Sequence, residues 1–320
     1  MFLSHAHPFP VRRAIVSIGK IPRVIGERLL YHLPCMLAMA EMVWQAGRMS
    51  LEDHIGDVCR KARLQTRTPI EDASSASGLT ESQLQEWETE GVIEVPVNVA
   101  ALAERLGLDA AKALRVVSGW VPQTVDITRW SELRVVITEE VFEVNSFMAW
   151  DAELRVAAIF DTGWFADDLF RIADENELSV RNLFITHMHG DHEAAIGDVR
   201  KHWPEIELHS NNSGSPERSR VVPGAVVAVG GLSVTVRLTP GHAEDGVTYV
   251  IEGWPDGAPA VAVVGDAIFA GSMGKDFNTP ELAQAKVRDE ILSLPVDTLI
   301  CPGHGPLTTV AEEQSNNPFF

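Results

Sequence analysis

The segment ITHMHGDH, residues 185–192, constrains the fold of this chain more than any other part of its sequence. It places three histidines and an aspartate within six positions, as His187, His189, Asp191 and His192. The apolar run LFI leads into it and predicts a buried strand. Burying imidazoles and a carboxylate at the end of such a strand costs free energy unless something binds them. The segment is therefore either an exposed turn rich in histidine or half of a metal site.

Three further junctions between a strand and a loop offer the same kinds of side chain. His242 lies in LTPGHAEDG, Asp266 in VVGDAIFAGS and His304 in ICPGHGP, each after an apolar strand and beside a glycine. Taken singly, each could be an ordinary hydrogen-bonded or exposed residue. Together with the first segment, they supply five histidines and two aspartates at strand ends. Imidazole and carboxylate ligands suit Zn, Fe or Mn, so the sequence predicts a metal site.

The second part of the chain mixes strand-like segments with helices, which predicts an α/β fold of two packed sheets with helices outside. Two strands are expected within residues 133–150, and single strands within 155–163, 181–186, 207–210, 225–229, 232–239, 247–252, 259–266 and 297–305. Amphipathic helices are expected within 165–178 and 280–294.

The order His-x-His-x-Asp-His, Gly-His, Gly-Asp and Pro-Gly-His resembles the metallo-β-lactamase superfamily over about residues 133–320. The resemblance implies an αβ/βα four-layer sandwich, with a hydrolase domain at 131–320. The phrases GDAIFAGSMGKDF and CPGHGPLTTVAEEQSNNPFF resemble in particular its glyoxalase II-like, or hydroxyacylglutathione hydrolase-like, branch. Carried over residue by residue, the resemblance implies a first metal held by His187, His189 and His242, a second held by Asp191, His192 and His304, and Asp266 bridging both.

This resemblance implies two divalent metal ions, with Zn expected and Fe or Mn as alternatives. A water that bridges two such ions ionises near neutral pH, and the hydroxide can attack an ester or thioester carbonyl. Asp191 is then both a metal ligand and the catalytic carboxylate that orients or deprotonates the water. We expect the partner to be a small-molecule substrate, with a thioester as one candidate.

Glutathione specificity is left open by one departure from glyoxalase II. That enzyme has a C-terminal helical domain that supplies part of the glutathione site, whereas 16 residues follow His304 here. Lys275 stands where the family phrase has a basic residue near the substrate, so it is a candidate for binding an anionic tail. The alternative is an ordinary exposed lysine in a loop.

Two other functions fit the same residues. The persulfide dioxygenase branch resembles this motif but uses a single iron, held by the counterparts of His187, His242 and Asp266. Two histidines and one carboxylate with open positions suit non-haem iron and dioxygen. The other alternative is a regulatory protein, in which a helix-turn-helix module acts and the metal domain senses a small ligand.

Residues 51–122 are expected to form a small all-α domain of five short helices. Thr80 followed by Gln83 predicts a capping box, Asp109 predicts another helix start, and Gly78 predicts a turn between the second and third helices. This arrangement resembles the Cro/repressor-type helix-turn-helix domain. An unrelated helical cap is the alternative, and Leu84 and Trp87 are expected on the inward face of the third helix.

The charge of this module argues against binding to nucleic acid. The third helix, in TESQLQEWETE, carries four glutamates and no basic residue, and the net charge of the whole chain is −19. Phosphate contacts need cations placed against the duplex, so we expect no nucleic-acid partner. A cap on the hydrolase or a homodimer surface is expected instead.

Residues 1–50 differ in charge from the rest of the chain. They carry six Lys and Arg against two acids, and their apolar stretch at 33–44 is too short to span a bilayer. We expect a poorly ordered basic leader, with a targeting peptide as the alternative, and no membrane association. Three scattered cysteines favour a reducing, cytoplasmic setting.

Overall fold

A computed structural model describes residues 50–216, 219–276 and 278–320. These residues belong to the second of two compact units of the chain, which extends over Arg48–Phe320. The expected leader lies, except for Ser50, outside the described residues. Within the described residues, no helix is both long and apolar enough to cross a bilayer.

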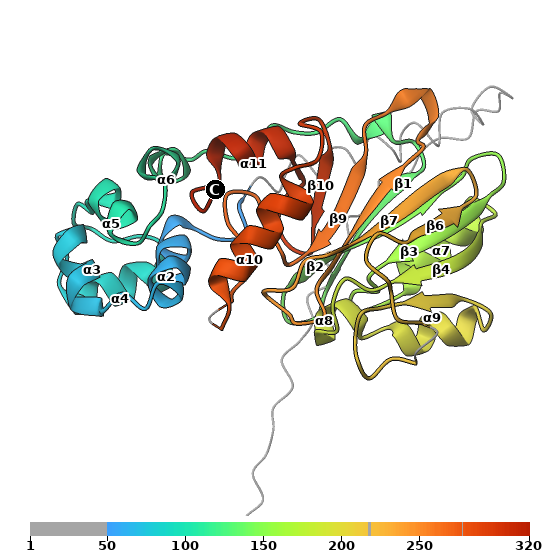
Figure 1. Cartoon of the computed structure of the whole chain (residues 1–320), viewed down its shortest axis with the longest axis horizontal. Coiled ribbons are helices and arrows are strands. Elements are labelled where there is room, and N and C mark those ends of the chain that lie inside the picture. The colour runs from blue at the N-terminus through green and yellow to red at the C-terminus, as the bar shows by residue number, and fades with distance from the viewer. Residues whose placement is uncertain (1–49, 217–218, 277) are drawn as a thin grey trace, which may run out of the picture. The chain divides into compact units, whose positions relative to one another are not determined.

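The all-α part consists of five short helices, as the sequence predicted, and they gather in one group in Figure 1. They are α2 (Ile55–Gln65), α3 (Ile70–Ser77), α4 (Glu81–Glu90), α5 (Val99–Arg105) and α6 (Ala110–Val117). Gly78 ends α3 in the left-handed region, at φ 77°, which a glycine adopts without steric cost. The likeness to a helix-turn-helix domain stays a prediction.

Local capping explains where two of these helices begin. Thr80 and Gln83 form the predicted capping box at the start of α4, and the Asp109 side chain accepts a hydrogen bond from the Lys112 backbone at the start of α6. Leu84 and Trp87 of α4 are both buried, as expected. They belong to a core that also takes in Met273, Ala283 and Phe319 from the second part of the chain. The helices therefore share a core with the rest of the fold.

Two mixed sheets form the second part of the chain. The first has the order β1-β2-β3-β4-β5 and the second β11-β10-β9-β8-β7-β6. Their bounds are β1 (Leu133–Glu139), β2 (Glu143–Trp150), β3 (Val156–Phe160), β4 (Ser179–Phe184), β5 (Glu207–His209), β6 (Val226–Val229), β7 (Leu232–Leu238), β8 (Val247–Glu252), β9 (Val261–Gly265), β10 (Leu299–Pro302) and β11 (Thr308–Thr309).

Alternating side chains of the central strands build three apolar layers. In β3, Ala158 and Phe160 face the core between the sheets, whereas Ala157 and Ile159 join a core on the other side. In β9, Val263 faces the central core and Val264 an outer core that contains residues of the C-terminal helices. Strands that are buried on both faces are apolar along their whole length, and β3 and β9 are continuous apolar runs in the sequence.

The second part of the chain also contains helices, some of which cover the outer faces of the two sheets. They are α7 (Asp167–Glu175), α8 (Gly190–Glu193), α9 (Ile196–His202), α10 (Pro280–Lys286), which continues as a π-helical turn at Val287–Ile291, and α11 (Val310–Asn316). Residues of α7 and α9 pack on the first sheet, and residues of the π-helical turn and α11 pack on the second. This confirms the four-layer αβ/βα sandwich. The sequence did not predict α8, α9, β11 or α11.

Strand direction brings several strand ends to one edge of the sandwich. The strands β3 and β4 run parallel to each other, and so do β9 and β10. The strand β7 is antiparallel to β8, which is antiparallel to β9, so β7 and β9 point the same way. The sheets also meet at this edge, where the Val247 backbone N–H donates to the Thr186 carbonyl at 2.8 Å. Loops that follow these strands can therefore share one site.

Candidate metal centre

The seven predicted ligands lie together at this edge of the sandwich. Their ligand atoms form three overlapping groups, and within each group all atoms lie within 4.8 Å of one another. The groups are His187 with His189 and His242, His187 with His192 and Asp266, and Asp191 with His192 and His304. The fold therefore brings together all seven residues that the resemblance implied.

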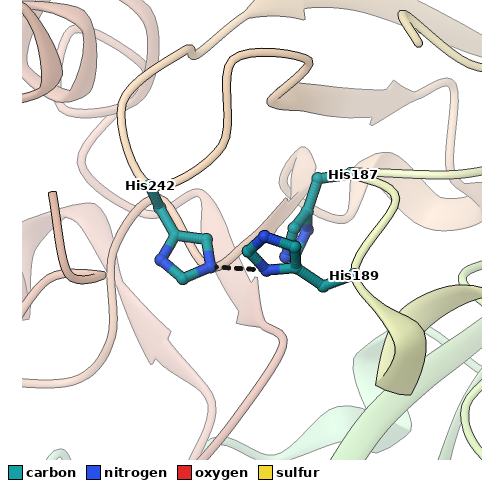
Figure 2. A group of neighbouring side chains, drawn as sticks. All are labelled: His187, His189 and His242. Carbon is teal, nitrogen blue, oxygen red and sulfur yellow. Dashed lines mark hydrogen bonds between the residues drawn. The ribbon is translucent and has the colours of Figure 1, made fainter. Parts of the chain in front are cut away.

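Figure 2 shows the first group, in which three imidazoles converge from two loops. The His189 Nδ1 and His242 Nε2 atoms lie 2.9 Å apart. Two nitrogens on one tetrahedral zinc, each about 2.0–2.1 Å from the metal, are separated by about 3.3 Å. The two rings are thus placed much as ligands of a single ion would be.

The group of Asp191, His192 and His304 lies next to the first group, and Asp266 lies between the two. His304 Nε2 is 3.1 Å from Asp191 Oδ2, and His192 Nε2 is 3.4 Å from the same oxygen. Asp266 Oδ2 lies 3.4 Å from His242 Nε2 and 3.5 Å from His304 Nε2. One carboxylate therefore touches ligands of both groups, as a bridging ligand must.

Hydrogen bonds to the Nδ1 atoms turn the rings so that Nε2 faces the centre. His242 Nδ1 lies 3.2 Å from the Lys275 carbonyl, and His304 Nδ1 lies 2.6 Å from the Glu143 carbonyl. A nitrogen that donates to a carbonyl carries the proton, so the other nitrogen is left with a free lone pair. The backbone thereby selects the tautomer that can bind a metal.

Asp161 is a functional residue that the sequence reasoning missed. It follows β3, is 1% exposed, and its Oδ2 lies 2.8 Å from His192 Nδ1. The Thr186 backbone N–H and hydroxyl each donate to the Asp161 carboxylate at 2.7 Å. A carboxylate behind a ligating histidine fixes the ring and raises its basicity. The signal was available, because Asp161 ends an apolar strand just as Asp266 does.

Buried polar atoms without hydrogen bonds test whether a cation fits this centre. His187 Nε2, His192 Nε2 and Asp266 Oδ1 are buried and have no hydrogen-bond partner. Leaving such atoms unsatisfied costs about 1–3 kcal/mol each, and more for a charged group. Metal ions bound here would satisfy all three, so the residues present fit a metal centre.

The electrostatics of the centre agree with this test. Burial lowers the pKa of His187 to about 2, so its imidazole is neutral, as a ligand must be. Burial also acts on His192, but the Asp161 and Asp266 carboxylates outweigh it and raise the pKa of His192 to about 10. Asp191 and Asp266 likewise raise the pKa of His304 to about 11 against burial. The carboxylates thus demand positive charge here, which divalent ions would supply in place of protons.

Close backbone approach leaves no room for a side chain beside the ligands. A Cβ atom on Gly303 would lie 2.4 Å from Asp266 Oδ1 and 2.5 Å from His192 Cε1. Real Cβ atoms do not approach other atoms so closely, so this position requires glycine. The glycine before His304, read from the sequence as part of a tight turn, also protects the ligand geometry.

Aromatic side chains form a wall on the His304 side of the centre. The Phe142 ring lies 5.5 Å from the His304 ring and 5.6 Å from the Trp164 ring, and the Phe269 ring lies 5.9 Å from His304. Phe142 is 48% exposed, so its ring remains available to a bound molecule. The side chain of Lys275 is exposed, and its carbonyl faces His242.

Two other histidines have partners away from the ligand groups. His209 Nε2 lies 2.9 Å from Asn182 Oδ1, and the His209 ring stacks on Phe184 at 4.4 Å. His202 stacks on Phe170 at 4.2 Å. These contacts account for both rings in structural terms.

Comparison with known proteins supports the same grouping. Residues 140–304 match the Metallo-beta-lactamase superfamily. This chain belongs to that superfamily. Its fold implies divalent metal binding, in agreement with the histidine and aspartate groups described above. The match begins after α6, so the five helices α2–α6 lie outside it.

Individual members of the superfamily are similar to this chain at modest identity. Hydroxyacylglutathione hydrolase GloC of Haemophilus influenzae is 27% identical over 211 residues, which cover 58% of this chain and 96% of that protein. The probable metallo-hydrolase YqgX of Bacillus subtilis is 28% identical over 186 residues, covering 51% and 86%. A crystal structure of ETHE1 from Myxococcus xanthus is 26% identical, with a TM-score of 0.52, covering 58% and 83%. The superfamily match and the two hydrolases support a hydrolase in general, and the ETHE1 structure is also compatible with the alternative reaction.

Proposed function

We propose that this chain is a dinuclear metal-dependent hydrolase that cleaves an ester or thioester. The observation that carries the proposal is the placement of Asp266 against ligands of both groups, at 3.4 Å from His242 and 3.5 Å from His304. A shared carboxylate is what a pair of ions requires. The similarity to GloC, a hydroxyacylglutathione hydrolase, supports a thioester among the substrates.

The residues of the centre have two roles, which are to bind the metal ions and to accept a proton from the attacking water. His187, His189 and His242 would hold one ion, and Asp191, His192 and His304 the other. Two divalent ions there would lower the pKa of a coordinated water toward neutrality and polarise a carbonyl oxygen. Burial opposes ionisation of Asp191, but contacts from His304 and His192 outweigh it and lower its pKa. Asp191 is thus a carboxylate at neutral pH, able to orient a water and accept its proton.

The aromatic wall favours a substrate with an apolar portion. Phe142 presents an exposed ring edge-on to His304, and Trp164 supports it by donating from its indole N–H to the Phe142 carbonyl at 2.9 Å. An apolar acyl or leaving group packed on this wall would be desolvated while its carbonyl points to the ions.

Metal content measured together with a substrate panel tests the proposal. We expect about two equivalents of Zn, Fe or Mn per chain, with hydrolysis of thioesters or esters in preference to lactams. One equivalent of iron with persulfide-dependent oxygen uptake would instead establish the dioxygenase. A chain that binds two ions but hydrolyses neither esters nor thioesters would refute the proposed reaction.

A further inference from the structure

The segment that leads into α2 lies against two of the loops that carry predicted metal ligands on the second sheet, those after β9 and β10. Gly305 follows His304, and a Cβ atom on Gly305 would lie 3.0 Å from Glu52 Cβ and 3.1 Å from its backbone nitrogen. A Cβ atom on Gly271, in the loop after Asp266, would lie 3.6 Å from Leu51 Cδ1. The helical part therefore reaches the edge of the metal centre.

A buried ion pair holds this segment in place. Lys61 of α2 is 3% exposed, pairs with the Asp53 carboxylate, and donates to the Met273 carbonyl at 2.9 Å. Its ammonium group also lies 5.1 Å from the centre of the Phe269 ring, which in turn lies against His304. Because an unpaired buried charge is costly, this arrangement fixes α2 to the loop between Asp266 and Lys275.

Glu52 brings a negative charge to this edge. Its side chain is exposed, yet its surroundings desolvate the carboxylate and raise its pKa, with His304 opposing and Asp53 and Asp266 adding to the rise. The carboxylate therefore lies within electrostatic range of one ligand from each of the loops after β9 and β10, Asp266 and His304. Lys61, a cation of the helical part that acts on Glu52, already pairs with Asp53.

A second acid of the helical part, Asp57, partly offsets the positive charge of Lys275. Burial raises the pKa of the Asp57 carboxyl in α2, and His54, Lys61 and, least of all, Lys275 oppose this rise, so Asp57 lies within electrostatic range of Lys275. An anionic substrate tail near Lys275 would thus also meet the acids of the helical part. The net charge of −19 adds a field of the same sign.

We propose that Glu52 is a substrate-specificity residue, which makes the enzyme prefer a substrate with a positive charge near the scissile carbonyl over one with a carboxylate there. The inference rests on the proposed ester or thioester hydrolysis. A substrate carbonyl positioned for attack would lie beside His304 and Asp266. A charged group of the substrate a few bonds from that carbonyl would then interact electrostatically with the Glu52 carboxylate. The helical part is then a component of the active site, and it sets the charge that the site accepts.

Matched thioesters test this role. Their acyl chains end in a trimethylammonium, a tert-butyl or a carboxylate group, on the same neutral thiol, and kcat/KM is measured at pH 8 with metal content checked. We expect Glu52→Gln to lower the ratio of kcat/KM for the cationic over the anionic thioester about tenfold, as for unit charges about 8 Å apart in a partly hydrated site. Glu52→Lys should reverse the preference. Glu81→Gln, an exposed acid at the start of α4, is the matched control and should leave the ratio as it is in the wild type.

A second measurement separates this inference from the proposed reaction. The affinities of the corresponding non-hydrolysable thioethers, measured by calorimetry, report the same charge preference without turnover. Failure to hydrolyse any thioester or ester would contradict the proposed reaction alone. An equal ratio of affinities in the wild type and in Glu52→Gln would overturn the role of Glu52, whatever the reaction.

Discussion

Replacing Asp161 by Asn should weaken the binding of one metal ion while leaving the fold intact. Asp161 has a φ of 57°, a conformation that asparagine also tolerates, so the substitution adds no backbone strain. The amide oxygen can still accept from the Thr186 backbone N–H, which now donates at 2.7 Å. The amide NH₂ must then occupy the place of Oδ2, which lies 2.8 Å from His192 Nδ1. Two N–H groups cannot face each other there, so His192 is driven to carry its proton on Nε2.

A proton on His192 Nε2 occupies the lone pair that would bind the ion shared with Asp191 and His304. Loss of a partner behind a ligating histidine typically lowers metal affinity about 10- to 100-fold, or about 1.4–2.7 kcal/mol. Titration of the metal-free protein against a competing chelator should therefore show one equivalent weakened and the other unchanged.

The matched control is Asp151→Asn. Asp151 also follows a strand, and its carboxylate accepts hydrogen bonds from the backbone of Glu153, Leu154 and Gly231. This variant should bind both equivalents like the wild type. Wild-type affinity for both ions in Asp161→Asn would refute the argument that Asp161 sets the His192 tautomer.

Three further predictions follow from contacts at or near the centre. Asp266→Ala should lose metal and activity together, whereas His209→Ala should keep both; an active Asp266→Ala enzyme would contradict the dinuclear centre. Phe142→Ala should raise KM several-fold for substrates with an apolar acyl group and change kcat less, which steady-state kinetics can decide. Burial raises the pKa of Glu313 from 4.5 to about 7, although hydrogen bonds from its neighbours oppose the rise. Between these two pH values Glu313 ionises in the unfolded state before it does so in the folded state, so the fold loses stability as the pH rises from about 4.5 to about 7. Glu313→Gln should gain stability relative to the wild type across that window, by up to about 3 kcal/mol in chemical denaturation, and a constant difference would show that Glu313 does not titrate there.

The metal ligands could be predicted from the sequence because each carries a local signal. A histidine or aspartate directly after an apolar strand, and beside a glycine, is visible without knowledge of its neighbours in space. The same holds for Thr80 and Gln83, whose capping box spans four consecutive residues. The strand segments were visible because strands buried on both faces are apolar throughout.

Elements with a weak local pattern could not be predicted in this way. The strand β11 has only two residues, and α11 begins directly after it. Glu313 in α11 is 0% exposed, and its buried carboxylate accepts hydrogen bonds from the Gly271 backbone and the Thr308 hydroxyl. A glutamate in a polar helix predicts an exposed face, and only the distant loop around Gly271 explains its burial.

The sequence by itself therefore determined the candidate ligands at strand ends, the two packed sheets with helices outside and the five helices α2–α6, since strand-end residues, periodicity and capping encode each of them locally. The full ligand assignment and the four-layer sandwich, by contrast, came from the family resemblance. Only the tertiary structure decided how the ligands are oriented and what surrounds them. The partners of His242 and His304 are backbone carbonyls of Lys275 and Glu143, and a carbonyl group has no signature in a sequence. The approach of Glu52 to Gly305 joins residues from opposite ends of the described chain, and such a contact depends on packing that no local pattern encodes.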